Sequence, residues 1–269
     1  MSPADINRLH DRLSDRDLAI LESLRTHRLL STRQVQRLHF THGYTSTSAA
    51  TRCANRVLDR LEGHGLIRRL ARRIGGVRRG SSGLIWQLGP TGERLLRTLR
   101  GGNRRRYVEP STTFAAHTVA TAELAIQLQE MSAAGDLELL SLETEPVCWR
   151  TFIAAHGAQE WLKPDLYAVT ASGEFEDHWF IEVDLATEHP PVVARKARIY
   201  QRYAATGAHQ AGHGLFPAVL WVVPDSARQM ALQAALRADA RLQPELFRVV
   251  TLDAFTTTVR ADTDLGASP

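Results

Sequence analysis

The sequence contains almost no lysine, which is its most unusual compositional feature. Of the 33 basic residues only Lys163 and Lys196 are lysines, and the other 31 are arginines. A compact ammonium can change its protonation state, which a guanidinium cannot, so two lysines retained in an arginine-rich chain indicate a specific chemical task. Codon bias is the alternative explanation for the two lysines.

Cysteines and long apolar runs are also few. Cys53 and Cys148 are far apart in the sequence, show no zinc-ligand spacing and lie among apolar residues, which predicts two buried free thiols. No apolar run approaches the ~20 residues that a membrane-spanning helix needs, and residues 5–12 carry too many charges for a signal peptide. We therefore expect a cytoplasmic protein without a membrane partner.

Several motifs of common nucleic-acid enzymes are missing. The chain has no glycine-rich loop ending in lysine and serine or threonine, which excludes a P-loop ATPase. It also lacks the His-hydrophobic-His pattern that holds the metal in the common relaxases. His209 and His213 are four residues apart, but Gly212 and Gly214 predict a solvated loop there rather than a zinc site.

Charge divides the chain into two parts. Residues 1–108 contain 22 arginines and 8 acidic residues, whereas residues 109–269 contain 11 basic and 21 acidic residues. A basic first half indicates binding to a polyanion, and an acid-rich second half indicates a separate role. The predicted segments are a first domain at 1–100, a linker at 101–110, a second domain at 111–255 and a frayed polar tail at 256–269.

The first domain has the pattern of a winged helix-turn-helix. Ser14 and Ser31 are in position to cap helices, and a third helix is expected over residues 46–62. Two strands are expected over residues 66–70 and 84–88, joined by a basic, glycine-rich hairpin. Three helices followed by such a hairpin are typical of DNA-binding domains of this class.

Arginines in this domain recur at positions suited to DNA. On the third helix they repeat every four residues, which places them on one face, and the hairpin carries two adjacent pairs. We predict that they bind double-stranded DNA through phosphates and guanine edges, with an affinity that falls steeply as salt rises. A solvated basic face is the alternative. The predicted DNA-binding residues are Arg52, Arg56, Arg60, Arg72, Arg73, Arg78 and Arg79.

Three carboxylates accompany two predicted strands of the second domain. Residues 166–169 and 179–185 are rich in β-branched and aromatic residues and are joined by a turn, which predicts an antiparallel pair. Glu182 and Asp184 then share one face, and Asp165 lies at the start of the neighbouring strand. Clustered carboxylates repel one another unless a cation neutralises them, so we predict a site for Mg²⁺ or Mn²⁺.

The order of these residues carries a family resemblance. Asp165 follows a proline on one strand, Glu182-Val-Asp184 lies on the next, and Lys196 and Tyr200 come after them. This arrangement resembles the replication-relaxation family of plasmids and other mobile elements, from about residue 14 to about residue 253.

The resemblance implies an α/β (α+β) fold of two domains. A winged helix precedes a PD-(D/E)xK nuclease-like domain, whose core is a helix, three strands, a helix and a further strand. One departure from the nuclease pattern is Asp184, which stands where a lysine is expected two residues after the acidic residue.

The resemblance also implies metal-binding roles. Asp165 and Glu182 would hold the metal, and Asp184 would either join them or orient the attacking water. Glu123 lies on a helix expected over residues 112–134 and is a further candidate metal ligand, because some enzymes of the nuclease class supply an acidic residue from the first helix.

Two lysines and two tyrosines complete the predicted catalytic set. Lys196 would reach back from its helix to stabilise the phosphate in the transition state, or Lys163, two residues before Asp165, would do so. Tyr200 or Tyr203 is a candidate covalent nucleophile that would leave a protein-linked DNA end. Tyrosines about one turn apart on an amphipathic helix are more commonly packing residues, which is the alternative.

Two functions follow from these patterns. The first is a metal-dependent DNA endonuclease or nickase, relaxase-like in action, that serves replication, mobilisation or conjugation of a plasmid or related element. The second is a DNA-binding replication or regulatory protein whose nuclease-like domain no longer cleaves and serves as an interaction surface. Expected partners are the DNA of the element's origin, a second copy of the chain, and replication or conjugation proteins.

Overall fold

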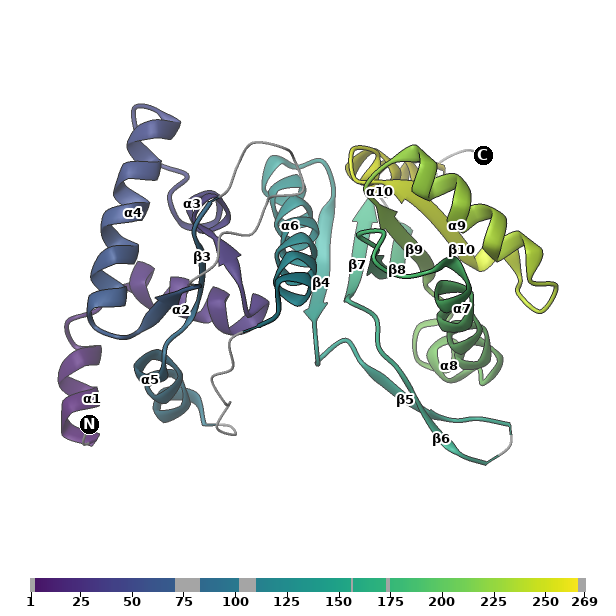
Figure 1. Ribbon diagram of the computed structural model, residues 1–269, viewed down its shortest axis with the longest axis horizontal. Coiled ribbons are helices and arrows are strands. Elements are labelled where there is room, and N and C mark those ends of the chain that lie inside the picture. The colour runs from purple at the N-terminus through teal and green to yellow at the C-terminus, as the bar shows by residue number, and fades with distance from the viewer. Residues whose placement is uncertain (1–2, 71–82, 102–109, 156, 173–174, 266–269) are drawn as a thin grey trace. The chain divides into compact units, whose positions relative to one another are not determined.

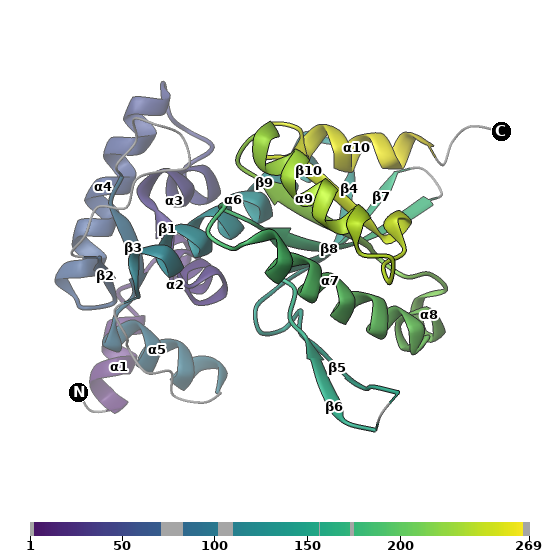
Figure 2. The ribbon, with the colours of Figure 1, turned by 45° about the vertical axis from the view of Figure 1, so that its right-hand side comes forward.

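The computed structural model describes residues 3–70, 83–101, 110–155, 157–172 and 175–265. The chain forms two compact units, Met1–Glu123 and Leu124–Pro269, which we call the front unit and the back unit (Figures 1 and 2). The class is mixed α/β, as predicted. None of the helices in the described ranges has the length and apolar character needed to cross a bilayer.

The front unit consists of helices around a small antiparallel sheet with the strand order β1-β3-β2. The two-residue strand β1 was not predicted. The elements are α1 (Pro3–His10), α2 (Asp15–His27), β1 (Leu30–Ser31), α3 (Thr32–His39), α4 (Thr47–Gly63), β2 (Ile67–Arg69), β3 (Ile85–Leu88), α5 (Pro90–Arg100) and the first half of α6 (Thr112–Ala134).

Local side-chain caps set where these helices begin. The Ser14 hydroxyl accepts a hydrogen bond from the backbone N–H of Asp17 at 3.2 Å, and the Asp17 carboxylate accepts one from the Ser14 backbone N–H at 2.9 Å. Ser31 and Gln34 form the same reciprocal pair at the start of α3. These caps satisfy N–H groups that a helix leaves unpaired at its N-terminus, so both predicted starts are confirmed.

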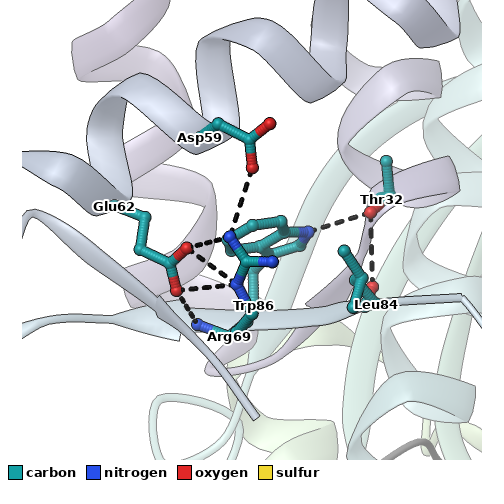
Figure 3. A network of polar contacts seen from close by, with 6 residues as sticks. All are labelled: Thr32, Asp59, Glu62, Arg69, Leu84 and Trp86. Atoms are coloured by element: carbon teal, nitrogen blue, oxygen red, sulfur yellow. Dashed lines mark hydrogen bonds and ion pairs between the residues drawn. The ribbon is translucent and has the colours of Figure 1, made fainter. Parts of the chain in front are cut away.

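Arg69 joins the β2–β3 hairpin to α4 (Figure 3). Its Nε lies 2.7 Å from Oε2 of Glu62, its Nη2 lies 3.3 Å from Oδ1 of Asp59, and its guanidinium covers the ring of Trp86 at 5.3 Å. The indole N–H of Trp86 donates to the Thr32 hydroxyl at 2.9 Å, which joins β3 to α3. One buried indole therefore fixes the base of the hairpin against both helices.

The two units meet within α6, between Glu123 and Leu124, and residues 102–109 of the predicted linker lie outside the described residues. The side-chain amide of Gln34 donates to the backbone carbonyl of Val119 at 2.9 Å and to Glu123 at 3.0 Å. Ala115, near the start of α6, packs in a buried cluster with Leu70. The first half of the helix thus belongs to the front unit, which composition alone did not indicate.

The back unit contains a five-stranded mixed sheet with the strand order β10-β9-β8-β7-β4. Strands β4, β7 and β8 are antiparallel, whereas β9 and β10 are added parallel to β8. After the second half of α6, the elements are β4 (Glu138–Thr144), β5 (Arg150–Ile153), β6 (Gln159–Leu162), β7 (Leu166–Ser172), β8 (Phe175–Val183), α7 (Pro190–Ala205), α8 (Ala208–His213), β9 (Ala218–Val223), α9 (Ser226–Ala238), a short 3₁₀ helix (Pro244–Leu246), β10 (Phe247–Thr251) and α10 (Phe255–Leu265).

Helices α7 and α9 lie on one side of this sheet (Figure 2). Alternate residues of the strands, including Tyr167, Phe180 and Trp221, pack with Ala197 and Leu232 of these helices in one buried cluster. Because strand residues alternate between faces, Glu182 points to the same side as Phe180. The Glu182 carboxylate therefore lies among side chains that are mostly apolar.

Residues 150–153, expected to be irregular or extended, pair with β6 in a hairpin that extends from the sheet (Figure 1). Two further segments of the back unit differ from prediction. Residues 208–213, expected to be a solvated loop, form α8, because Gly207 and Gly214 adopt left-handed conformations that suit helix ends. The expected polar tail begins with α10, in which Phe255 and Val259 are fully buried.

We predict that acid destabilises the protein through His27 of the front unit. Burial, and next the neighbouring His39, lower the pKa of His27 to about 4 from an ordinary value near 6.5. Between these pH values the unfolded chain binds more protons than the folded one, so stability is fully present above about pH 6.5 and is lost as pH falls toward about 4, by at most roughly 3 kcal/mol.

Urea unfolding of the wild type and of His27→Gln at about pH 7.5 and about pH 4.5 measures this effect. The variant cannot bind the proton, so its free energy of unfolding should fall less between the two pH values than that of the wild type. Equal losses in both proteins would contradict the prediction.

Candidate functional site

Glu182 is the centre of the candidate site. It lies near the end of β8, is 2% exposed, and both of its carboxylate oxygens are hydrogen-bonded by α7. The Lys196 ammonium donates to Oε2, and the Tyr200 hydroxyl donates to Oε1. Lys196 and Tyr200 are four residues apart and so project from the same side of the helix. One turn of α7 therefore supplies both partners of the buried carboxylate.

Asp165 lies at the end of β8 that carries Glu182. It immediately precedes β7, and its backbone N–H donates to the carbonyl of Ile181 at 3.2 Å. Its Oδ2 accepts from the backbone N–H of Val183 at 2.7 Å. Strand β7 pairs with β8 from Leu166 and Ile181 onward, so Asp165 and Glu182 lie at the same end of this antiparallel pair.

Burial and neighbouring charges shift the pKa values of Glu182 and Lys196. Burial raises the pKa of Glu182 to about 8, the Lys196 ammonium opposes the shift, and Asp165 adds to it. Burial disfavours the charge of Lys196, but the carboxylates of Glu182 and Asp165 outweigh this effect and raise the pKa of the lysine above its usual value. The pair of acids thus holds a cation, which in this arrangement is an ammonium.

Asp184 does not join the other two carboxylates. Strand β8 ends at Val183, so the alternation that predicted a common face for Glu182 and Asp184 stops one residue too early. Arg228, in the first turn of α9, donates to Asp184 Oδ2 at 2.6 Å and to Oδ1 at 3.2 Å, and both side chains are nearly buried. The backbone N–H of Ala186 also donates to Oδ1 at 2.5 Å. Asp184 is therefore a partner in an ion pair, whereas the sequence predicted a metal ligand.

The other predicted catalytic residues have different environments. Lys163 is exposed, and its ammonium lies 4.6 Å from the Trp149 ring centroid, so Lys196 is the lysine at the carboxylates. Tyr200 is fully buried, and burial, followed by Glu182, raises the pKa of its hydroxyl well above the usual value. Tyr203 is buried in the aromatic core. Burial of both tyrosines argues against the covalent role.

Glu123 is engaged by α3. Its carboxylate forms an ion pair with Arg37 and accepts from Gln34 at 3.0 Å, all within the front unit. An arginine therefore already compensates the charge of Glu123.

The predicted DNA-binding arginines divide into three groups. Arg52 and Arg56 on α4 are exposed and, within the described part of the chain, contact no acidic residue. Arg60 donates to Asp17 at 2.5 Å, and Asp17 is 1% exposed, so Arg60 also holds α4 to α2. The hairpin arginines, which are Arg72, Arg73, Arg78 and Arg79, lie outside the described residues.

The donors at the centre of the site fit a hard divalent cation. Mg²⁺ binds one or two protein carboxylates and completes its shell with water and phosphate oxygens. Asp165 and Glu182 supply two buried carboxylates at neighbouring strand ends, which is a donor set of this kind. Asp184 and Glu123 do not, because each is paired with an arginine.

Sequence reasoning missed two parts of this site. Nothing in the sequence pairs Arg228 with Asp184, because 44 residues separate them. The role of Tyr200 as a hydrogen-bond donor to Glu182 had a local signal, since Tyr200 follows Lys196 by one helical turn.

The fold and the site define an α/β protein in which a small helical unit precedes a mixed sheet carrying a buried carboxylate–lysine pair. The chain belongs to the replication-relaxation family, whose sequence model matches residues 21–219. The matched range contains α4 and the residues Asp165, Glu182 and Lys196. No curated protein and no solved structure matches the chain.

Loss of Arg228 should destabilise the back unit strongly. Arg228→Met would leave the Asp184 carboxylate buried without its cation, and removing one partner of a buried ion pair costs about 3–5 kcal/mol. Denaturant unfolding measures the loss. Arg237→Met on the exposed side of the same helix is the matched control and should change stability by less than about 0.5 kcal/mol.

The double variant Asp184→Asn/Arg228→Met removes both charges and should recover part of that stability. A change no larger in Arg228→Met than in the Arg237→Met control would show that the ion pair is not structural.

Proposed function

We propose that this chain is a DNA-binding, metal-dependent endonuclease or nickase that acts on the DNA of a plasmid or other mobile element. The observation that carries the proposal is the buried Glu182 carboxylate, which is held by Lys196 and lies at the same strand end as Asp165. An ordinary sheet would place an apolar residue at this position, because an acidic side chain is costly to bury.

The element order of the back unit supports a PD-(D/E)xK nuclease-like domain. Helix α6 is followed by β4, β7 and β8, then α7 and β9, with the β5–β6 hairpin inserted between β4 and β7. This succession of a helix, three strands, a helix and a strand is what the family resemblance implied. Asp165 lies just before the start of β7 and Glu182 near the end of β8. Because these neighbouring strands are antiparallel, both residues lie at the same end of the sheet.

The residues of the site have complementary roles. Bound by Asp165 and Glu182, Mg²⁺ or Mn²⁺ would supply a Lewis acid and lower the pKa of the attacking water. The Lys196 ammonium would stabilise the negative charge that develops on the scissile phosphate in the transition state. Tyr200 fixes the orientation of the Glu182 carboxylate. Asp184 and Arg228 stabilise the turn that follows β8.

The front unit supports the DNA-binding part of the proposal. Its order from α2 to β3 is helix, strand, helix, helix, strand, strand, which is the order of a winged helix. Arg52 and Arg56 are exposed on α4, the helix that would enter the major groove. Arginine side chains there suit phosphates and guanine edges.

A second function is favoured by the environment of the carboxylates. Both oxygens of Glu182 already accept hydrogen bonds, and Asp184 occupies the position of the nuclease lysine and pairs with Arg228. These features also suit a nuclease-like domain that no longer cleaves. Such a protein would bind DNA and use its back unit to contact a replication or conjugation protein, or a second copy of the chain.

Nicking of supercoiled plasmid distinguishes the two functions. With Mg²⁺ or Mn²⁺ and DNA carrying the element's own origin, the wild type should produce open circles, whereas Asp165→Asn and Glu182→Gln should lose at least about 100-fold of the rate. Lys196→Met should lose a similar amount if its ammonium holds the phosphate. Glu138→Gln, an exposed change on β4, is the matched control and should nick at the wild-type rate.

Tight binding of intact plasmid by the wild type, with no open circles under either metal, would rule out the enzyme and leave the binding protein. The product should also migrate free of protein after denaturation, since both tyrosines of α7 are buried.

DNA affinity should depend on the two exposed arginines of α4. Arg52→Ala and Arg56→Ala should each weaken binding and reduce the slope of log K against log salt by about 1, because each arginine neutralises one phosphate. Fluorescence anisotropy over a salt series measures both quantities. Arg237→Ala, an exposed helical arginine of the back unit, should leave the slope unchanged. Identical slopes in all four proteins would contradict the placement of DNA on α4.

A further inference from the structure

Three histidines that the carboxylate site does not use converge in the back unit. They are His178 of β8 and His209 and His213 of α8, and one ring nitrogen from each lies within 4.8 Å of the other two. In the described part of the chain, no other group of three or more potential metal-binding side chains comes together in this way. Because His209 and His213 are four residues apart, α8 presents both imidazoles to the same side.

His209 has an unsatisfied nitrogen inside this cluster. The side chain is 3% exposed, and its Nε2 finds no hydrogen-bond partner among the described residues. Buried polar atoms in native proteins are nearly always paired, and each exception calls for a missing ion, water or chemical role. A cation at the centre of the three rings would satisfy this nitrogen.

The surroundings of His209 and His178 favour the neutral form of their rings, which is the form that binds metals. Burial, and next His213 and His178, lower the pKa of His209 to about 4, so its ring is neutral at physiological pH. Burial, followed by His213, also lowers the pKa of His178. A neutral imidazole offers a nitrogen lone pair, which an imidazolium lacks.

A second layer of residues holds the rings in place. The Tyr167 hydroxyl lies 2.7 Å from Nδ1 of His178, which fixes that ring in the manner typical of metal-bound histidines. Phe180 and Phe216 pack edge-on against His209, with ring centroids 5.7 Å and 6.2 Å away. His213 is exposed, so solvent reaches the cluster from one side. Three nitrogens and one open position match the coordination of zinc in His₃ sites.

We propose that His178, His209 and His213 form a transition-metal site that binds Zn²⁺, with a fourth position open to solvent. Imidazole nitrogens favour zinc over Mg²⁺, which prefers oxygen ligands. The site is separate from the carboxylate pair, because His178 and Glu182 are four residues apart on β8, or about 13 Å along the strand. It does not depend on the proposed nuclease function.

The bound ion would connect α8 to β8. Helix α8 follows α7 directly, and α7 carries Lys196 and Tyr200. A metal that ties the end of this helical segment to the strand bearing Glu182 would therefore help to hold both partners of the carboxylate in position.

Zinc titration of the purified full-length chain, first stripped with a chelator, tests the proposal. The wild type should take up a single Zn²⁺, measured by calorimetry and by elemental analysis after gel filtration. His213→Ala is the informative variant because the side chain is exposed and its loss should leave the fold intact, as circular dichroism can verify. Its zinc affinity should fall by more than about 100-fold, since loss of outer-shell partners alone costs 10–100-fold.

Two further variants assign the ion to the histidines. His213→Cys keeps a zinc ligand and should restore binding, and the Co²⁺ form should then show a thiolate-to-cobalt charge-transfer band that the wild type lacks. His64→Ala, an exposed change in the front unit, should bind zinc as the wild type does.

Glu182→Gln separates this site from the carboxylate pair and should retain zinc. The proposal is overturned if the wild type shows no saturable uptake, if His213→Ala binds zinc as tightly as the wild type, or if Glu182→Gln abolishes binding while His213→Ala does not.

Discussion

Burial of the Glu182 carboxylate is the constraint on which the back unit depends. An ionised side chain in an apolar layer is stable only if its charge and its hydrogen-bonding capacity are both met nearby. Lys196 supplies the charge and Tyr200 the second hydrogen bond, which requires α7 to cross the sheet with one particular turn above β8. The same arrangement packs the ring of Tyr200 on α7 against that of Phe180 on β8, with ring centroids 5.5 Å apart.

The two acidic residues of the Glu182-Val-Asp184 motif have separate partners. Glu182 interacts with Lys196 of α7, whereas Asp184 interacts with Arg228 of α9. The motif therefore connects the end of β8 to both helices. Strand β8 ends between the two residues, at Val183. The departure from the lysine expected in nucleases therefore has a structural account, because Asp184 anchors α9 while Lys196 brings the ammonium from α7.

Features encoded by neighbouring residues could be predicted from the sequence. The caps at Ser14 and Ser31 appear where expected, and the β7–β8 hairpin forms as an antiparallel pair, although β8 begins earlier and ends at Val183. Features that depend on distant partners could not be predicted. The ion pair of Asp184 is set by a residue 44 positions away. Burial of Phe255 in α10 likewise depends on the completed sheet.

The direction of the strands has a consequence for the order in which the back unit is assembled. Asp165 and Glu182 meet through an antiparallel hairpin, a local contact that needs little loop closure, whereas β9 joins β8 only after α7 and α8 have crossed the sheet. The carboxylates of Asp165 and Glu182 therefore precede Lys196 in the chain, and Glu182 becomes buried only when α7 packs on the sheet.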